Sequence, residues 1–99
     1  MHSTIVISPR ASQHVYEIYS WYEEQQIGLG KRFLSALTAA FQKIERNPAG
    51  YQIAYGSHRR AIVGKFPYAV FYEEQETQII ITGVLHTARN SDDWPNLLE

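Results

Sequence analysis

Near Gly50 the spacing of hydrophobic residues in this chain changes from helical to strand-like, and that change limits the folds open to it. Between the short run Thr4–Ile7 and Gly50, apolar side chains recur every three or four residues, as on one face of a helix. After it, they form short runs with the β-branched and aromatic composition of strands. A chain of 99 residues is long enough for one modest core. We therefore expect one domain, spanning residues 1–99, with helices before most of the sheet.

Two helices are predicted in the first half of the chain. The first begins at Ser8-Pro9, because serine caps helices and proline suits the first turn. Gly28 and Gly30 separate it from the second, which ends at Asn47-Pro48, since proline disfavours helix in the residue before it. Two helices with so short a connection form an αα-hairpin. Their apolar stripes comprise Ala11, Val15, Ile18 and Tyr22, then Phe33, Leu37, Phe41 and Ile44.

Four strands are predicted, one before the hairpin and three after it. They are Thr4–Ile7, Arg60–Phe66, Tyr68–Glu74 and Gln78–His86. The last three have short links, which favour an antiparallel meander. The order β-α-α-β-β-β indicates an α+β fold, with the helical hairpin packed on one face of a small, mainly antiparallel sheet. The tail from Asp92 to Glu99 is expected to form one capped turn.

The last two strands carry apolar residues on both faces. Residues 79–81 are three consecutive isoleucines, and residues 69–72 are likewise apolar throughout, a pattern typical of strands buried on both sides. One helical hairpin covers only one face. We therefore expect exposed apolar surface on the other face and favour an external protein partner as its cover. The alternative is that the tail, with Trp94, Leu97 and Leu98, folds back over it.

Charge is balanced overall and uneven locally. Nine basic and ten acidic residues give a net charge of −1, unlike a strongly basic nucleic-acid-binding domain. Between Arg46 and Tyr72, however, the chain has four basic residues and no acidic one: Arg46, Arg59, Arg60 and Lys65. This segment fits contact with phosphate or with an acidic protein segment. Ordinary solvated strand charges explain it equally well.

Several kinds of site are excluded by the residue types present. Without cysteine there is no disulfide, zinc–thiolate site or catalytic thiol. The four histidines, His2, His14, His58 and His86, lack metal-ligand spacing, so neither a metal nor a cofactor is expected. The segment Gly28–Arg32 lacks the residues of a phosphate-binding loop and is expected to be a hairpin turn. The acidic pairs Glu23–Glu24, Glu73–Glu74 and Asp92–Asp93 are expected to be solvated.

No targeting segment or membrane-spanning run is recognised in the sequence. The first ten residues lack the apolar core of a signal peptide, and no stretch approaches the 18 or so apolar residues of a membrane span. The absence of cysteine fits a reducing compartment. We therefore expect a cytoplasmic protein that does not contact membranes.

His86 is the histidine with the clearest chemical potential. It ends the last predicted strand and is followed by Arg89. An imidazole beside guanidinium groups can transfer protons and hold phosphate during RNA cleavage. The alternative is a strand-end histidine with satisfied hydrogen bonds and no chemical role.

Three segments resemble the RelE/ParE toxin superfamily of bacterial type II toxin–antitoxin modules. They are the hairpin ending in NPAGY, the stretch RRAIVGKFPYAVFY and the stretch IIITGVLHTARNSDDW. The resemblance extends from the first strand to Trp94. It implies a compact toxin held inactive in a hetero-oligomer with a small antitoxin, which wraps it with an amphipathic or extended segment. The surface expected to bind the antitoxin or the target comprises Arg59, Arg60, Lys65, Phe71, Tyr72 and Trp94.

The superfamily contains DNA gyrase poisons of the ParE kind and mRNA endoribonucleases of the RelE kind. The ribonucleases commonly carry a basic residue where this chain has Ala69, and often a tail aromatic hydroxyl where it has Trp94. The chain thus resembles ParE-like plasmid-stabilisation toxins more closely, which implies gyrase poisoning without chemistry of its own. The alternatives are an endoribonuclease acting on free or ribosome-bound mRNA with His86, Arg60 and Arg89, or an inactive homologue that only binds its antitoxin.

Overall fold

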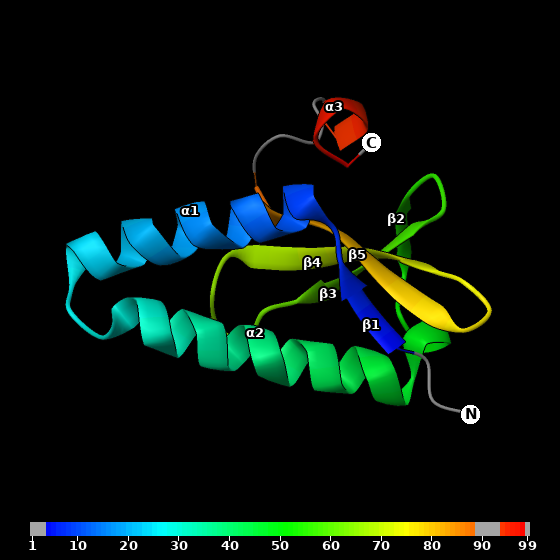
Figure 1. Ribbon diagram of the computed structural model, residues 1–99, viewed down its shortest axis with the longest axis horizontal. Helices are drawn as coiled ribbons and strands as arrows, with labels where there is room; N and C mark the ends of the chain where they lie inside the picture. Colours follow the sequence, from blue (N-terminus) through cyan, green and yellow to red (C-terminus); the bar gives the residue numbers. More distant parts are fainter. Residues whose placement is uncertain (1–3, 89–93, 99) are drawn as a thin grey trace.

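Residues 4–88 and 94–98 are described by the computed structural model (Figure 1). The elements are β1 (Thr4–Ile7), α1 (Pro9–Gln25), α2 (Leu29–Arg46), a 3-10 turn η1 (Pro48–Gly50), β2 (Ile53–Tyr55), β3 (His58–Ile62), β4 (Tyr68–Glu74), β5 (Gln78–His86) and α3 (Trp94–Leu98). Figure 1 shows α1 and α2 side by side as a hairpin that extends beyond the sheet. The predicted α+β architecture is confirmed.

The five strands form one mixed sheet in the order β1-β5-β4-β3-β2. From β2 to β5, each strand pairs antiparallel with the next strand along the chain. β1 pairs parallel with the first half of β5, where Ile7 lies opposite Ile81. The meander is confirmed, and β4 and β5 have the predicted bounds. β3 is shorter and earlier than predicted, because Gly64 adopts φ 54° and the Val63 N–H bonds to the Tyr68 carbonyl, so the chain turns there. The three-residue β2 was not predicted.

The outer ends of both helices lie where the sequence indicates, whereas α2 begins at Leu29, inside the segment Gly28–Arg32 that we expected to be the turn. The Ser8 side chain accepts a hydrogen bond from the Ala11 N–H at 3.0 Å, and Pro9 is the first residue of α1. α2 ends at Arg46, and Pro48 opens the 3-10 turn η1. The chain therefore leaves the helical half within a few residues and enters the sheet at β2.

The turn between α1 and α2 is held by Glu23, which we expected to be solvated. Its carboxylate accepts hydrogen bonds from the N–H groups of Gly28 and Gly30, each at 3.0 Å. These groups lie at the start of α2, where backbone N–H groups lack helical partners and attract negative charge. Gly28 has φ 91°, and a Cβ on Gly30 would lie 2.9 Å from both Glu23 and the Tyr19 ring. Both glycines are therefore required by the turn.

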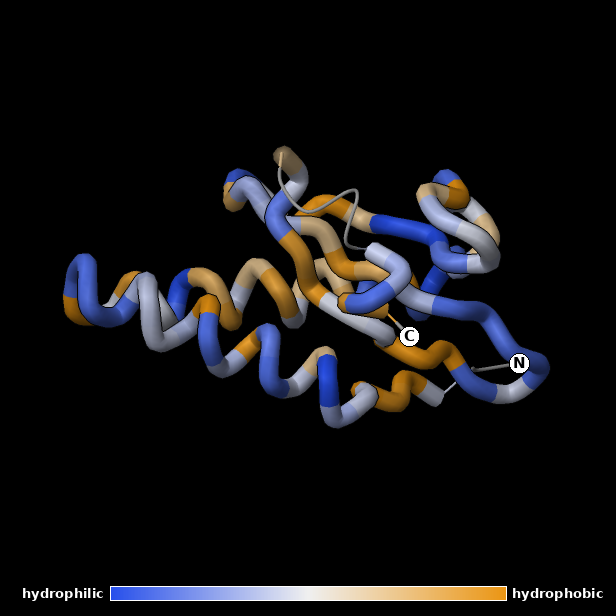
Figure 2. Tube along the Cα trace, turned by 90° about the horizontal axis from the view of Figure 1, so that it is seen from above, coloured by the Kyte–Doolittle hydropathy of each residue, from blue (hydrophilic) through white to orange (hydrophobic). Residues whose placement is uncertain are grey.

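The main core lies between the hairpin and one face of the sheet. Figure 2 shows hydrophobic segments concentrated in the strands and alternating with hydrophilic ones along the hairpin. The predicted stripes supply Ala11, Ile18, Tyr22, Phe33, Leu37 and Ile44 to this core, with Val15 and Phe41 partly buried against it. The strands contribute Ala61, Val70, Tyr72, Ile79, Ile81 and Val84. We call this side of the sheet the hairpin face.

The opposite side of the sheet is covered by α3, and we call it the tail face. Phe71 and Leu85 pack there with Leu98 of α3, and the Trp94 ring lies 5.0 Å from that of Phe71. A Cβ on Gly83 would lie 2.6 Å from the Leu98 Cδ2, so a larger residue there would force the Leu98 side chain to shift. The favoured expectation of an apolar patch awaiting an external partner is therefore wrong at this position, because the chain's own tail buries it.

Two kinds of site are absent from the part of the chain that the structure describes. None of the helices there is long and apolar enough to span a bilayer. Nor do the described His, Asp and Glu side chains form a group of three or more that could hold a metal ion.

Candidate protein-binding surface

Arg59 and Arg60 lie on opposite faces of the sheet. Arg59 is paired with Tyr72 on the hairpin face, where its guanidinium donates to the Tyr51 carbonyl at 2.6 Å. Its Nε also lies 3.6 Å from a Glu74 carboxylate oxygen. Arg59 is therefore occupied in joining β3 to the segment before β2, and Glu74 is paired rather than freely solvated.

Arg60 is paired with Phe71 and lies on the tail face. It lines a pocket of about 220 Å³ together with Gln52, Ile53, Ala54 and Trp94. Among the described residues, its guanidinium has no hydrogen-bond or ion-pair partner. The Trp94 Nε1 is buried and likewise lacks a hydrogen-bond partner within the described ranges. The two residues therefore combine an available cation with an aromatic wall.

The remaining residues of the expected surface differ in accessibility. Lys65 is exposed in the turn between β3 and β4, whereas the Phe71 and Tyr72 side chains are only 1% and 0% exposed. The Tyr72 hydroxyl donates to the Pro48 carbonyl at 2.5 Å, and burial raises the pKa of Tyr72 to about 12. Phe71 and Tyr72 thus belong to the two cores, and Tyr72 is a poor proton donor near neutral pH.

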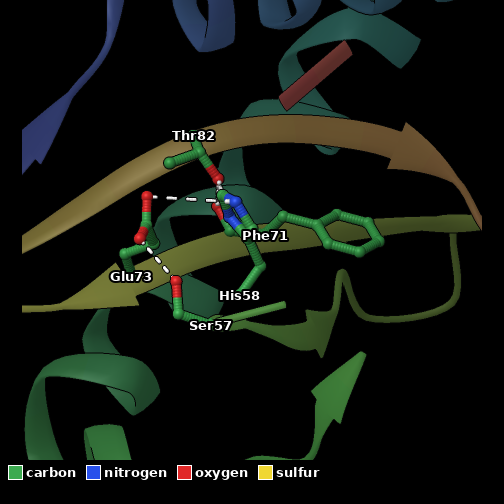
Figure 3. A network of polar contacts seen from close by, with 5 residues as sticks. All are labelled: Ser57, His58, Phe71, Glu73 and Thr82. Carbon is green, nitrogen blue, oxygen red and sulfur yellow. Dashed lines mark hydrogen bonds and ion pairs between the residues drawn. The ribbon is translucent and has the colours of Figure 1, made fainter. Parts of the chain in front are cut away.

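A buried polar network that the sequence did not reveal joins three strands next to Arg60 (Figure 3). His58 is 4% exposed, with its Nδ1 2.9 Å from the Thr82 hydroxyl oxygen. Thr82 donates its one proton to the Phe71 carbonyl at 3.1 Å, so its oxygen accepts from His58 Nδ1–H. His58 Nε2 lies 3.9 Å from Glu73, which also accepts from Ser57 at 2.6 Å. Glu73 is therefore not the solvated side chain we expected.

This network depends on an irregularity in the sheet. The β4–β5 register shifts between Phe71 and Tyr72, so that Thr82 lies outside the regular pairing and its hydroxyl reaches the Phe71 carbonyl. Tyr55 stacks on the His58 ring at 5.6 Å. Together these contacts fix β2 and β3 against β4 and β5, and so set the position of Arg60.

His86 lies away from Arg60, on the hairpin face. It is paired with Tyr68, whose ring is 5.3 Å away, and its Nδ1 accepts from the Ala88 N–H at 3.1 Å. Arg60 of β3 pairs with Phe71 of β4, which in turn pairs with Gly83 of β5. Gly83 lies three residues before His86 on β5. Standard sheet spacings place the Cα atoms of Arg60 and His86 ~14 Å apart, with side chains on opposite faces. The sheet therefore does not bring Arg60 and His86 to one phosphate. Arg89, like Asp92 and Asp93, lies outside the described residues.

Comparisons with known proteins agree on one kind of molecule. Residues 5–91 match the family described as "ParE toxin of type II toxin-antitoxin system, parDE". Among solved structures, the chain resembles one titled "Chromosomal ParDE TA system from P. aeruginosa", with a TM-score of 0.75 and 11% sequence identity. That alignment covers 85% of this chain and 95% of the other, and at this identity it supports the fold alone. No curated protein sequence matches the chain.

Proposed function

Because the chain belongs to the ParE toxin family of type II toxin–antitoxin systems, we propose that it stops growth by poisoning DNA gyrase in the cytoplasm. We propose further that a small antitoxin protein holds it inactive in a hetero-oligomer. The observation that carries this proposal is the family match, which spans residues 5–91 of a 99-residue chain.

The arrangement of polar residues supports action by binding rather than by RNA cleavage. Cleavage needs a proton acceptor, a proton donor and cations around one phosphate. Arg60 and His86 occupy opposite faces of the sheet, and Tyr72 is buried with a raised pKa. Within the described ranges, these residues do not converge on a common point. The alternative endoribonuclease mechanism therefore has less support than gyrase poisoning.

The pocket at Arg60 and Trp94 is our candidate for the centre of the protein-binding surface. Arg60 supplies the positive charge, and Trp94 supplies an aromatic wall next to it. Ile62, two residues along β3 on the same face, is 52% exposed and adds apolar surface. This combination suits an acidic residue flanked by apolar ones on the partner, because arginine and tryptophan are frequent anchors of protein interfaces.

The first experiment measures DNA and protein synthesis by pulse labelling after the chain is induced without its antitoxin. Gyrase poisoning predicts that DNA synthesis falls first and that purified protein inhibits supercoiling by gyrase. An earlier fall in protein synthesis would overturn this proposal in favour of mRNA cleavage. No change in either would leave only an inactive, antitoxin-binding homologue.

A second experiment tests the Arg60 pocket by comparing Arg60→Ala with Lys43→Ala. Lys43 is an exposed basic residue on α2 and serves as the matched control. Loss of an interface arginine commonly costs more than 1 kcal/mol, so Arg60→Ala should weaken antitoxin binding or gyrase inhibition by ~10-fold. Equal behaviour of the two variants in both assays would remove Arg60 from the interface.

A further inference from the structure

A second pocket lies on the other side of the molecule, where α1 passes the ends of β4 and β5. It has a volume of about 340 Å³. Its lining consists of four aromatic rings and one proline: Trp21, Tyr22, Tyr68, His86 and Pro67. We call it the aromatic box. It is separate from the Arg60 pocket, because His86 and Tyr68 lie on the hairpin face and Arg60 on the tail face.

The rings of the box meet at steep angles. Trp21 and Tyr22 have centroids 5.2 Å apart and planes at 77°. Tyr22 and Tyr68 are 6.2 Å apart at 75°, and Tyr68 and His86 are 5.3 Å apart at 77°. In such edge-to-face contacts the edge of one ring packs against the face of the next. All four rings also line the pocket, so the surface that these contacts leave uncovered borders it.

Part of the box serves the main core, and part of it does not. Tyr22 and Tyr68 also contact Phe33, so their positions are explained by packing. Trp21 is 54% exposed, so most of its large apolar ring is left in contact with solvent. A neighbouring pocket of about 240 Å³ shares Tyr68 and His86 with the box and adds the carboxylate of Glu17. The exposed indole of Trp21 and the nearby carboxylate of Glu17 are the two features that packing of the core does not explain.

We propose that the aromatic box binds the side chain of an arginine from a protein partner. The faces of aromatic rings attract cations, and tryptophan does so most strongly. A guanidinium is planar, so it can stack on Trp21 while its N–H groups bond to the Glu17 carboxylate. Glu17 is exposed; it accepts a long 3.4 Å bond from Gln13 and also lies close enough to His14 to interact with it electrostatically.

The surroundings of the box are compatible with a guest cation. The nearest basic side chain of α1, Arg10, is already bonded to the Asn96 carbonyl at 2.6 Å. The volume lies at the lower end for small-molecule pockets, which suits one side chain rather than a cofactor. A lysine ammonium would also be attracted by the rings, but it can neither stack on them nor form a bidentate hydrogen bond with a carboxylate. Arginine is therefore the better fit.

The test is an NMR titration of the full chain with N-acetyl-L-arginine methylamide. We expect saturable shifts of the Trp21 indole N–H and of the Tyr68 and His86 rings, with a dissociation constant on the order of millimolar. The citrulline analogue, which has nearly the same shape but no charge, should produce no saturable shifts. The lysine analogue should bind several-fold more weakly. Because no toxicity is measured, this result is independent of whether gyrase is the target.

Matched variants separate the box from nonspecific effects. Trp21→Leu should weaken arginine binding by ~10-fold, whereas Tyr16→Leu should not, since Tyr16 is an exposed aromatic residue of α1 outside the box. Glu17→Gln should weaken binding by about fivefold, whereas Glu24→Gln should not. All four positions are exposed, so the variants are expected to fold. Equal binding of the citrulline and arginine analogues, or equal loss in Trp21→Leu and Tyr16→Leu, would overturn the proposal.

Discussion

Replacing Glu23 with alanine should destabilise the whole domain, although the residue lies near the tip of the hairpin. The substitution removes a carboxylate that accepts the Gly28 and Gly30 N–H groups at the start of α2. Loss of a helix cap costs ~0.5–2 kcal/mol, and the charge at a helix N-terminus adds ~0.3–1 kcal/mol. Water can replace part of these bonds, because Glu23 is half-buried. We therefore expect a loss of ~1.5 kcal/mol in the free energy of unfolding.

For a domain of this size, such a loss corresponds to a fall in Tm of ~6–12 °C. Urea denaturation followed by circular dichroism should show a lower midpoint with an unchanged slope, because the surface exposed on unfolding is the same. Glu23→Gln should lose about half as much, since its amide oxygen still accepts one bond. The control is Glu24→Ala, an exposed neighbour. A midpoint for Glu23→Ala equal to that of Glu24→Ala would refute the assigned cap.

Two further predictions concern the contacts between the tail, α1 and β5. Gly83→Ala places a methyl group 2.6 Å from the Leu98 Cδ2, so Leu98 should shift, loosening the packing of α3 at a cost of ~1 kcal/mol and moving the fluorescence of Trp94 to the red; unchanged stability and fluorescence would contradict this packing. Burial lowers the pKa of His14, and its Nδ1 accepts a β5 N–H at 3.2 Å, so the unfolded chain takes up a proton near pH 6.5 before the folded one does. Stability should therefore be full above that pH and decline as pH falls below it, and His14→Gln, which accepts the same bond without titrating, should flatten the decline in a series of urea midpoints.

The hairpin and the two central strands are predictable because their signals are local. Ser8-Pro9 and Asn47-Pro48 fix the outer ends of the two helices through backbone chemistry within a few residues. β4 and β5 are long apolar runs closed by polar residues, so their bounds follow directly. β2 has only three residues and pairs irregularly with β3, and so short a segment carries no measurable period.

The features of the binding surface depend on contacts between distant parts of the chain. Arg59 and Arg60 differ in role because successive residues of a strand lie on opposite faces of the sheet. The register of β3 decides which of the two lies on which face, and a slip of one residue would exchange them. The His58–Thr82 bond spans 24 residues and uses the one residue of β5 that the register shift between β4 and β5 leaves out of the regular pairing. The contact of Trp94 with Phe71 is not predictable from composition, which does not distinguish a tail that docks on the sheet from one that does not.

The position of β5 determines when the sheet of this protein can be completed during its synthesis. β5 lies between β1, made first, and β4, so the two sides of the sheet join only through residues 78–86. β1 therefore finds its partner only after residues 78–86 have been made, because the two strands pair across about 74 positions in sequence. Until then, β1 and β4 both present unpaired edges, which favour capture by proteases or chaperones. Fragments that end before residue 78 therefore lack the pairing that completes the sheet.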